Sequence, residues 1–438
     1  MKLTFEDRAV RERNRPLRAL AAGSVGNFIE WYEFGVYGYV ATVVAERFFT
    51  PAGGSAAEGL VRTYASFGLA FFFRPLGAAL FGRLADRLGR RPVLILVVAL
   101  MTGATALIGV LPTYAQAGAL APWLLTFLRV VQGLSAGGEF GGAVAMLTEF
   151  APPGRRGLYG AWQSFTVALG LLGGAGVAVG LSTLLTADQF GSWGWRLPFL
   201  LALPLGALAL WLRIGLDETP EFREPAVAAV RSVRVPVRAV ALAGARVMGW
   251  SAAGYTFLVV LPSYLQAALH TGFRAALLAT VVANLGFAAA ILPAGMLSDR
   301  VGRRPVMLAG AGLVVLLALP LLHLLQDPGA SAAVRGAALF GAGAVVGLMA
   351  GPGPALLAEM FPARARCTGL GLAYALSNAV FSGCAGLIIT EAVQRTGNLD
   401  VPGYYAAATC AVSVLALLGP QRTEPGRKAG REARREAG

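Results

Sequence analysis

Long apolar stretches separated by short polar segments follow one another along the whole chain. Twelve of them are long enough to cross a membrane as an α-helix, which takes about 20 largely apolar residues. They lie near residues 19–49, 58–82, 93–112, 120–148, 158–186, 194–214, 238–269, 274–297, 305–325, 335–358, 367–391 and 402–419. The strands of a β-barrel would instead be short segments of alternating polarity. The pattern therefore predicts an all-α membrane protein with twelve transmembrane helices.

Two internal repeats relate the first half of the chain to the second. The segment GRLADRLGRRP at Gly82–Pro92 recurs as GMLSDRVGRRP at Gly295–Pro305, with eight of eleven positions identical and an offset of 213 residues. A second set, Glu149, Pro152 and Arg156, recurs with an offset of 210 residues. Nearly equal offsets for two separate signals indicate that the halves are structural copies. We therefore expect two pseudo-symmetric six-helix bundles.

The polar segments set the expected limits of these bundles. We predict an N-terminal bundle at residues 19–214 and a C-terminal bundle at residues 238–419. The polar residues 215–237 between them are expected to form a cytosolic linker. Residues 1–18 and 420–438 are basic and short, and they are expected to be cytosolic termini.

Composition and charge agree with this topology. Of the 438 residues, 56% are hydrophobic and only 14% charged, with a mean hydropathy of +0.64; a soluble protein carries about 25% charged residues. A net charge of +14 could point to nucleic acid, but 28 of the 37 Lys and Arg residues fall in the segments expected to be cytosolic. This asymmetry follows the positive-inside rule. It predicts a multi-pass protein of the inner or plasma membrane, with both termini cytosolic and no nucleic-acid partner.

Several classes of site are not expected from the remaining residue counts. The three cysteines lie in apolar C-terminal segments without a CxxC pair, and there are two isolated histidines. This pattern predicts neither a disulfide framework nor a metal site. An integral membrane enzyme usually needs a buried constellation of histidine and carboxylate. We therefore expect neither an enzyme nor a bound cofactor.

The first apolar stretch carries two carboxylates. Glu30, Glu33 and Tyr37 fall within an arc of roughly 60° on one face of a helix. Two neighbouring carboxylates repel each other when both are ionised, which favours a proton on one of them near neutral pH. Glu30 and Glu33 are therefore candidates for proton coupling and Tyr37 for substrate binding. The alternative is a static pair that supports helix packing.

Two arginines also lie within apolar stretches. Arg74 is eight residues before Gly82, about 12 Å along the second helix. Its planar fork can hold a carboxylate by two hydrogen bonds, either that of a substrate or that of a neighbouring glutamate. In the stretch 120–148, Arg129, Gln132 and Glu139 fall within an arc of about 80° if the helix is continuous. Arg129 and Gln132 are therefore candidates for substrate binding and Glu139 for proton coupling, and here too a purely structural ion pair is the alternative.

The remaining candidates lie in the second half and in the repeated loops. Tyr374 and Asn378 are four residues apart and share a helix face, where they would line a substrate cavity. Asp86 and Arg90, like Asp299 and Arg303, are also four apart and can pair if the loop is helical. Two equivalent copies favour a gating role for these pairs over a simple topology anchor.

These segments resemble the major facilitator superfamily and, within it, the metabolite:proton symporters. The resemblance is carried by the repeated loop, by GNFIEWYEFGVYGY at 26–39, by RVVQGLSAGGEF at 129–140 and by EMFPARARCTGLGLAYALSNAVFSG at 359–383. Some segments are most similar to proline/betaine symporters and others to α-ketoglutarate and citrate symporters. The resemblance implies a monomer and a role for Arg129, and also for Glu139, in proton transfer or in stabilising the site. The short C-terminal tail lacks the coiled coil of the osmosensing carriers.

Together these observations predict a proton-coupled symporter for a small carboxylated metabolite or a zwitterionic osmolyte. The substrate would bind between the two halves near the middle of the membrane, and the halves would expose it alternately to each side. The expected partners are this small molecule, the lipid bilayer and the proton as coupling ion. A proton-driven exporter of the same fold remains the alternative, since the residues alone do not fix the direction of transport.

Overall fold

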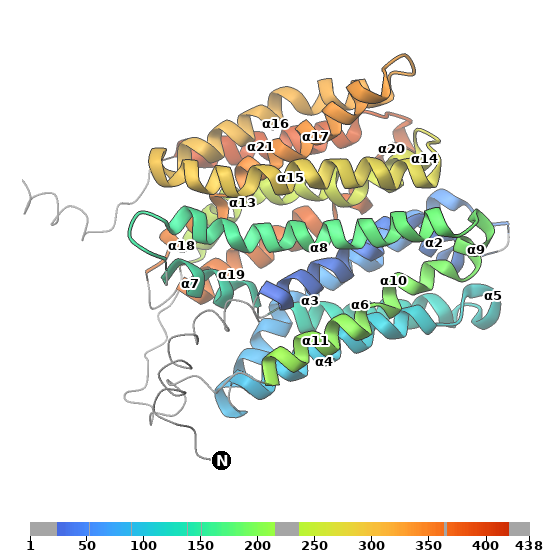
Figure 1. Ribbon diagram of the computed structural model, residues 1–438, viewed down its shortest axis with the longest axis horizontal. Helices are drawn as coiled ribbons and strands as arrows, with labels where there is room; N and C mark the ends of the chain where they lie inside the picture. Colours follow the sequence, from blue (N-terminus) through green and yellow to red (C-terminus); the bar gives the residue numbers. More distant parts are fainter. Residues whose placement is uncertain are drawn as a thin grey trace, which may run out of the picture.

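The computed structural model describes residues 24–51, 53–88, 90–137, 139–149, 151–214, 236–362 and 366–419, except for the side chains of a few helical residues. Throughout these residues the secondary structure is helical, without strands (Figure 1). Nine of the helices in this part are long and apolar enough to cross a membrane. Large apolar side chains lie exposed on the outside of the helices; Trp123 is 73% exposed and Leu316 is 70% exposed. An apolar exterior over long helices confirms the prediction of an all-α membrane fold.

The helices of the first half follow the predicted stretches in order. Residues 24–39 are helical and lead into two short segments. The elements after them are α2 (Ala41–Val44), η1 (Ala45–Phe49), α3 (Ala56–Leu88), α4 (Arg90–Val110), α5 (Tyr114–Ala117), α6 (Leu120–Ala136), α7 (Glu139–Glu149), α8 (Arg156–Leu184), α9 (Ala187–Ser192), η2 (Gly194–Arg196), α10 (Leu197–Leu200) and α11 (Ala202–Ile214).

The second half repeats this order. Its elements are α13 (Val237–Tyr255), η3 (Thr256–Val260), α14 (Leu261–Ala267), α15 (Phe273–Val301), α16 (Arg303–Gln326), α17 (Ala332–Ala350), α18 (Gly353–Glu359), α19 (Arg366–Ser377), η5 (Asn378–Gly383), α20 (Ala385–Thr396) and α21 (Val401–Leu418). Counting interrupted helices once, the described part contains six segments in each half, consistent with a twelve-helix fold.

Interruptions mark several of these helices. The π-helical turns η3 and η5 lie within otherwise α-helical segments, and η1 ends the segment that begins with the first helix. Such turns are frequent at functional sites. The stretch predicted as one helix at 120–148 is also divided, because α6 ends at Ala136 and α7 begins at Glu139. Residue 138 and the side chain of Glu139 lie outside the described residues, so the common arc inferred for Arg129, Gln132 and Glu139 stays a prediction.

Glycines bring two pairs of helices into close contact, one pair at the equivalent place in each half. In the first half a Cβ at Gly133 would lie 1.9 Å from the backbone oxygen of Ala70, between α6 and α3. In the second half a Cβ at Gly343 would lie 1.8 Å from the backbone oxygen of Ala283, between α17 and α15. Small residues of this kind let helix backbones approach closely inside a membrane.

The two halves meet along α8 and α15, which lie side by side across the centre of the molecule (Figure 1). At one end, the Tyr64 hydroxyl lies 2.6 Å from that of Ser263, and Thr42 donates to Gln266 at 3.0 Å. At the other end, Asp299 of α15 contacts the beginning of α8. The halves therefore touch at both ends of the helices.

Candidate functional site

A small cavity lies between the two halves near the middle of the helices. Its volume is about 40 Å³, which is room for a few water molecules. Six of its lining residues come from the first half and nine from the second: Trp31, Phe140, Gln163, Ser164, Val167, Leu171, Trp250, Ser251, Gly254, Tyr255, Leu258, Val259, Phe287, Tyr374 and Asn378. No charged side chain is among them. The cavity is therefore aromatic and neutral.

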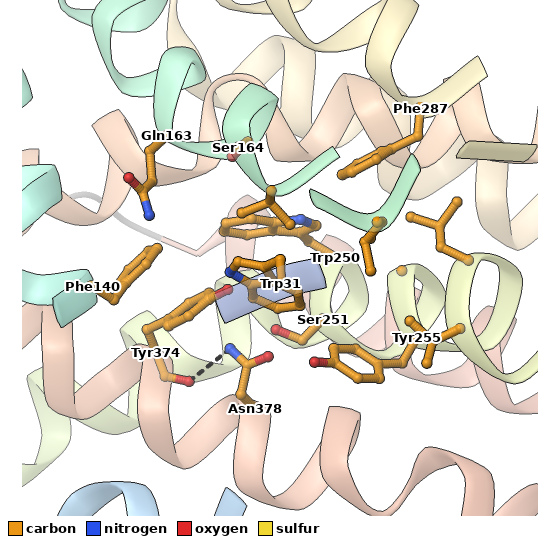
Figure 2. A pocket seen from close by; sticks show the side chains of 15 residues that line it. Trp31, Phe140, Gln163, Ser164, Trp250, Ser251, Tyr255, Phe287, Tyr374 and Asn378 are labelled. Atoms are coloured by element: carbon orange, nitrogen blue, oxygen red, sulfur yellow. Dashed lines mark hydrogen bonds between the residues drawn. The ribbon is translucent and has the colours of Figure 1, made fainter. Parts of the chain in front are cut away.

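Aromatic rings form much of the wall of this central cavity. In Figure 2 the indoles of Trp31 and Trp250 lie in the middle of the view, and the rings of Tyr374 and Tyr255 lie on either side of them. The rings of Phe140 (α7) and Tyr374 (α19) stack with centroids 3.6 Å apart and an interplanar angle of 11°. Trp250 lies 5.6 Å from Tyr374 and Trp31 lies 6.1 Å from Tyr255, between ring centroids. The stacked pair joins the two halves directly and closes one side of the cavity.

A few polar groups face this cavity. Asn378 donates from Nδ2 to the backbone oxygen of Tyr374 at 3.0 Å (Figure 2). Ser164 donates to the backbone oxygen of Ala350 at 2.7 Å. The hydroxyls of Ser251 and Tyr255 are buried and have no hydrogen-bond partner among the described residues. Because unpartnered hydroxyls cost free energy when they are buried, these two are available for a polar ligand in the cavity.

The predicted carboxylates of the first helix are buried, and each is bonded to a different helix. Glu30 forms an ion pair with Arg74 of α3, with Oε1 and Nη2 3.2 Å apart and both side chains at most 7% exposed. The Arg74 guanidinium carbon also lies 4.3 Å from the centre of the Phe71 ring and 6.0 Å from that of Trp31. Since Trp31 lines the central cavity, the Trp31 side chain separates the ion pair from the cavity.

Glu33 ends a chain of buried hydrogen bonds. Arg129 donates from Nη1 to Gln132 Oε1 at 2.8 Å, and Gln132 donates from Nε2 to Thr105 Oγ1 at 2.6 Å. Thr105 in turn lies 2.6 Å from Glu33 Oε2, to which its hydroxyl can donate. The sequence indicated three of these four residues. Thr105 was missed, because a threonine in an apolar helix gives no signal of its partners.

The other predicted residues lie around this network. Tyr37 shares a hydrogen bond of 2.6 Å with Ser66, and the guanidinium carbon of Arg129 lies 4.2 Å from the centre of the Tyr37 ring. Tyr37, Arg129 and Gln132 are not among the residues that line the central cavity, so their role in substrate binding stays a prediction. The side chain of Glu139 lies outside the described residues, and its proton-coupling role also stays a prediction.

One copy of the repeated loop forms a junction between the halves. Asp299 accepts hydrogen bonds from the backbone nitrogens of Gly157 at 2.7 Å and Leu158 at 2.9 Å, at the beginning of α8. A carboxylate is favoured there by the partial positive charge of the helix N-terminus. Arg303 donates to Asp299 at 2.8 Å and pairs with Glu359 at 3.2 Å.

Asp299 and Arg303 form an ion pair although the helix is interrupted between them at Gly302. Gly302 separates α15 from α16 with a φ of 101°, a conformation that favours glycine. In the first copy of the loop, the side chains of Asp86 and Arg90 lie outside the described residues. The gating role of both pairs stays a prediction.

Substitution Asp299→Asn tests this junction. We expect the halves to separate more readily at this end, because the helix terminus and Arg303 both lose a charged partner. A charge-assisted hydrogen bond contributes about 1.5–3 kcal/mol, and its loss lowers the free energy needed to separate the halves by a similar amount. A cysteine placed at Ser251 should then react about tenfold faster with a hydrophilic maleimide. The control is Glu391→Gln, which breaks an exposed pair with Arg395. Equal labelling rates in Asp299→Asn and the parent would refute the gating role.

Comparisons with known proteins place the chain among membrane carriers. Residues 19–224 match the family described as sugar (and other) transporter, and residues 247–437 match the major facilitator superfamily. The ectoine/proline transporter ProP of Corynebacterium glutamicum is 36% identical over 95% of this chain and 86% of its own length. The proline/betaine transporter of Escherichia coli K12 is 32% identical over 94% of this chain and 85% of its own length.

A relative with a different substrate is similar to the same degree. The alpha-ketoglutarate permease of Escherichia coli K12 is 35% identical over 95% of both chains. Among solved structures, the crystal structure of a D-xylose-proton symporter matches 93% of this chain and 98% of its own, with a TM-score of 0.74 and 20% identity. At that identity the match shows the fold alone, and it agrees with the fold predicted from the repeats.

Proposed function

We propose that this chain, which belongs to the major facilitator superfamily, is a proton-coupled symporter of a small zwitterion. The relatives that it matches are transporters and not enzymes. The observation that carries the proposal is the buried Glu30–Arg74 ion pair next to a neutral aromatic cavity between the halves. An inner-membrane location with both termini cytosolic follows from the distribution of Lys and Arg. Both six-helix halves of the chain line the cavity, which supports a monomer as the working unit.

Competition for Arg74 couples the proton to the substrate in this proposal. While Glu30 is ionised, it occupies Arg74 by the 3.2 Å ion pair. A substrate carboxylate that takes Arg74 leaves Glu30 in a buried site without this guanidinium, which favours its protonation. Protonation of Glu30 conversely releases Arg74 for the substrate. Proton and substrate thus promote each other's binding, as linkage requires.

Thr105 allows Glu33 to take part in both protonation states. The Thr105 hydroxyl has two acceptors within reach, Glu33 Oε2 at 2.6 Å and the backbone oxygen of Met101 at 2.9 Å. A hydroxyl has a single proton to donate. It points to Glu33 when that carboxylate is ionised, and it turns to Met101 when protonated Glu33 becomes the donor. The hydrogen bonds of Glu33 are thereby kept while a proton arrives and leaves.

The composition of the central cavity favours a zwitterion over a di- or tricarboxylate. Its walls supply aromatic faces, hydroxyls and two amides but no charged group, and Arg74 lies directly behind Trp31. Aromatic faces bind ammonium and quaternary ammonium groups, and one arginine serves one carboxylate. Proline, betaine or ectoine, after which some relatives are named, would fit this arrangement better than alpha-ketoglutarate or citrate, after which others are named.

Substrate entry requires the halves to move. The central cavity of about 40 Å³ accommodates a few waters, which is less space than proline or glycine betaine occupies. The stacked rings of Phe140 and Tyr374 and the Asp299 junction both lie between the halves. Their separation would open the cavity toward the predicted cytosolic side, as in alternating access by rocking of two repeats.

Uptake into proteoliposomes tests the proposed function. Under an inward proton gradient, we expect accumulation of glycine betaine, proline or ectoine that a protonophore abolishes, and no accumulation of α-ketoglutarate or citrate. Accumulation of α-ketoglutarate or citrate alone would refute the zwitterion assignment. Accumulation of the zwitterion only under an outward gradient would show an exporter, the alternative direction left open by the sequence.

Substitution Trp250→Leu tests the aromatic wall. An aromatic face contributes roughly 0.5–2 kcal/mol to binding of a cation, so the apparent affinity for glycine betaine should fall by about three- to thirtyfold. The matched control is Trp211→Leu, because Trp211 is 70% exposed on the outer face of α11. Measurement of concentration-dependent uptake by both variants decides the point. An equal loss of affinity in both would exclude a specific role for Trp250.

A further inference from the structure

A second, smaller cavity lies inside the first half, next to both carboxylates. Its volume is about 10 Å³. The lining residues come from the first helix, from α4 and from α11: Gly26, Ile29, Glu30, Glu33, Val97, Val98, Met101, Thr102 and Ala209. None of them lines the central cavity. The two carboxylates therefore face a space that is distinct from the central cavity proposed for the substrate.

Thr102 supplies the third polar side chain of this cavity. It is 6% exposed, and its hydroxyl has no hydrogen-bond partner among the described residues. Buried threonines elsewhere in the structure, such as Thr63 and Thr280, donate to the backbone oxygen four residues earlier, as is usual in helices. The Thr102 hydroxyl forms no such bond, so it remains available to a group in the cavity.

The neighbouring helix cannot provide the missing partner. In Figure 1, α11 lies along α4. At Gly206 of α11, even a Cβ atom would be 2.2 Å from Thr102 Oγ1. No longer side chain fits at that position, and the adjoining residues Ile29, Val98 and Ala209 form an apolar cluster. A small polar molecule is the remaining partner for the hydroxyl.

The size and polarity of the cavity fit one water molecule. A buried water needs about 10–15 Å³ of accessible volume and two to four polar partners. The cavity has about 10 Å³ and three polar side chains, Glu30, Glu33 and Thr102. We propose that this cavity is a water site that relays the coupling proton between Glu30 and Glu33, outside the substrate site. This inference rests on the proposed function, since it assumes that Glu30 takes up a proton.

The relay conserves atoms and charge. Protonated Glu30 gives its proton to the water oxygen, and the water gives one of its own protons to the Glu33 carboxylate. The water is unchanged, and one proton has moved from the carboxylate paired with Arg74 to the one bonded to Thr105. The Thr102 hydroxyl holds the water by a third hydrogen bond. Glu30 is then ionised again and can recover Arg74 after the substrate has left.

Substitution Thr102→Val tests the relay in the reconstituted full chain. Valine keeps the shape of threonine but removes the hydroxyl that holds the water. A lost hydrogen bond of about 1.4 kcal/mol corresponds to about a tenfold change in rate. We therefore expect the ratio of proton-driven uptake to substrate exchange at equal pH to fall about tenfold. Thr102→Ser, which keeps the hydroxyl, should restore the ratio.

The control for a general threonine effect is Thr280→Val in α15, whose hydroxyl bonds only within its own helix. We expect the wild-type ratio in that variant. A wild-type ratio in Thr102→Val, or an equal fall in Thr280→Val, would overturn the relay.

Infrared difference spectra of the detergent-solubilised protein detect the water without any transport. On protonation of the carboxylates, the wild type should show a water O–H band that shifts in H₂¹⁸O and is lost in Thr102→Val. A spectrum with a carboxyl band but no ¹⁸O-sensitive band would overturn the water site. If the wild type shows the water band but no proton-driven uptake, the proposed function fails while the water site stands.

Discussion

Substitution Glu30→Gln is expected to abolish proton-driven accumulation of the substrate while substrate exchange continues. Glutamine keeps the size of the side chain but can neither carry a proton nor hold Arg74 by charge. Arg74 then remains available to the substrate carboxylate in every state of the cycle. A gradient of two pH units, which drives about 100-fold accumulation through one coupled proton, should give no accumulation in the variant. Uptake and exchange by the same proteoliposomes measure both effects.

Two further variants separate coupling from general damage. Glu58→Gln removes an exposed carboxylate that pairs with Arg62, and we expect wild-type accumulation. Arg74→Ala should lose both uptake and exchange. The substrate carboxylate loses its binding partner, and Glu30 loses the positive charge of the α3 side chain with which it forms an ion pair. Undiminished accumulation by Glu30→Gln would rule out the competition for Arg74 and transfer the coupling role to another group. Glu33→Gln should also lose accumulation, since the relay would have no acceptor.

The second large effect is expected from Gly133→Ala, which should destabilise the fold. The added Cβ would lie 1.9 Å from the backbone oxygen of Ala70, so α6 and α3 would have to separate along their contact. Overpacking of this kind costs about 1–3 kcal/mol, and more when backbones must move. We expect a lower thermal midpoint in detergent and a smaller fraction of monodisperse protein by size-exclusion chromatography. Gly343→Ala should behave alike, because α17 and α15 repeat the contact in the second half.

Gly176→Ala in α8 provides the matched control, since a Cβ there would meet no atom within 4 Å. Alanine is the better helix former by about 1 kcal/mol, so this variant should be as stable as the parent or more stable. If Gly133→Ala and Gly176→Ala have the same thermal midpoint, the close helix contact does not limit stability.

Much of the architecture followed from the sequence, because the membrane restricts which residues it accepts. Apolar stretches of sufficient length predicted the helical segments, and the repeat at Gly82–Pro92 and Gly295–Pro305 predicted the two related halves. The buried charges Glu30 and Arg74 were conspicuous for the same reason, since an ionisable side chain in an apolar helix is costly and rarely incidental. The structure brings these two together at 3.2 Å.

The sequence did not reveal the interruption of the stretch 120–148. Nothing in its apolar pattern distinguishes a continuous helix from the division between Ala136 and Glu139, because the same apolar residues suit both. Gly137 lies at a close helix contact, with a Cβ there only 2.0 Å from the Arg74 backbone oxygen.

The sequence by itself determined the membrane fold, the repeat and the buried charges, because each leaves a mark in the order of apolar and polar residues. Only the tertiary structure decided that Thr105 bonds Glu33, that Trp31 and Trp250 form one cavity wall, and that Thr102 faces a second cavity. Threonine and tryptophan are ordinary residues of membrane helices, so neither stands out along the chain. Their roles arise from contacts between distant helices, and those contacts exist only after the helices have packed.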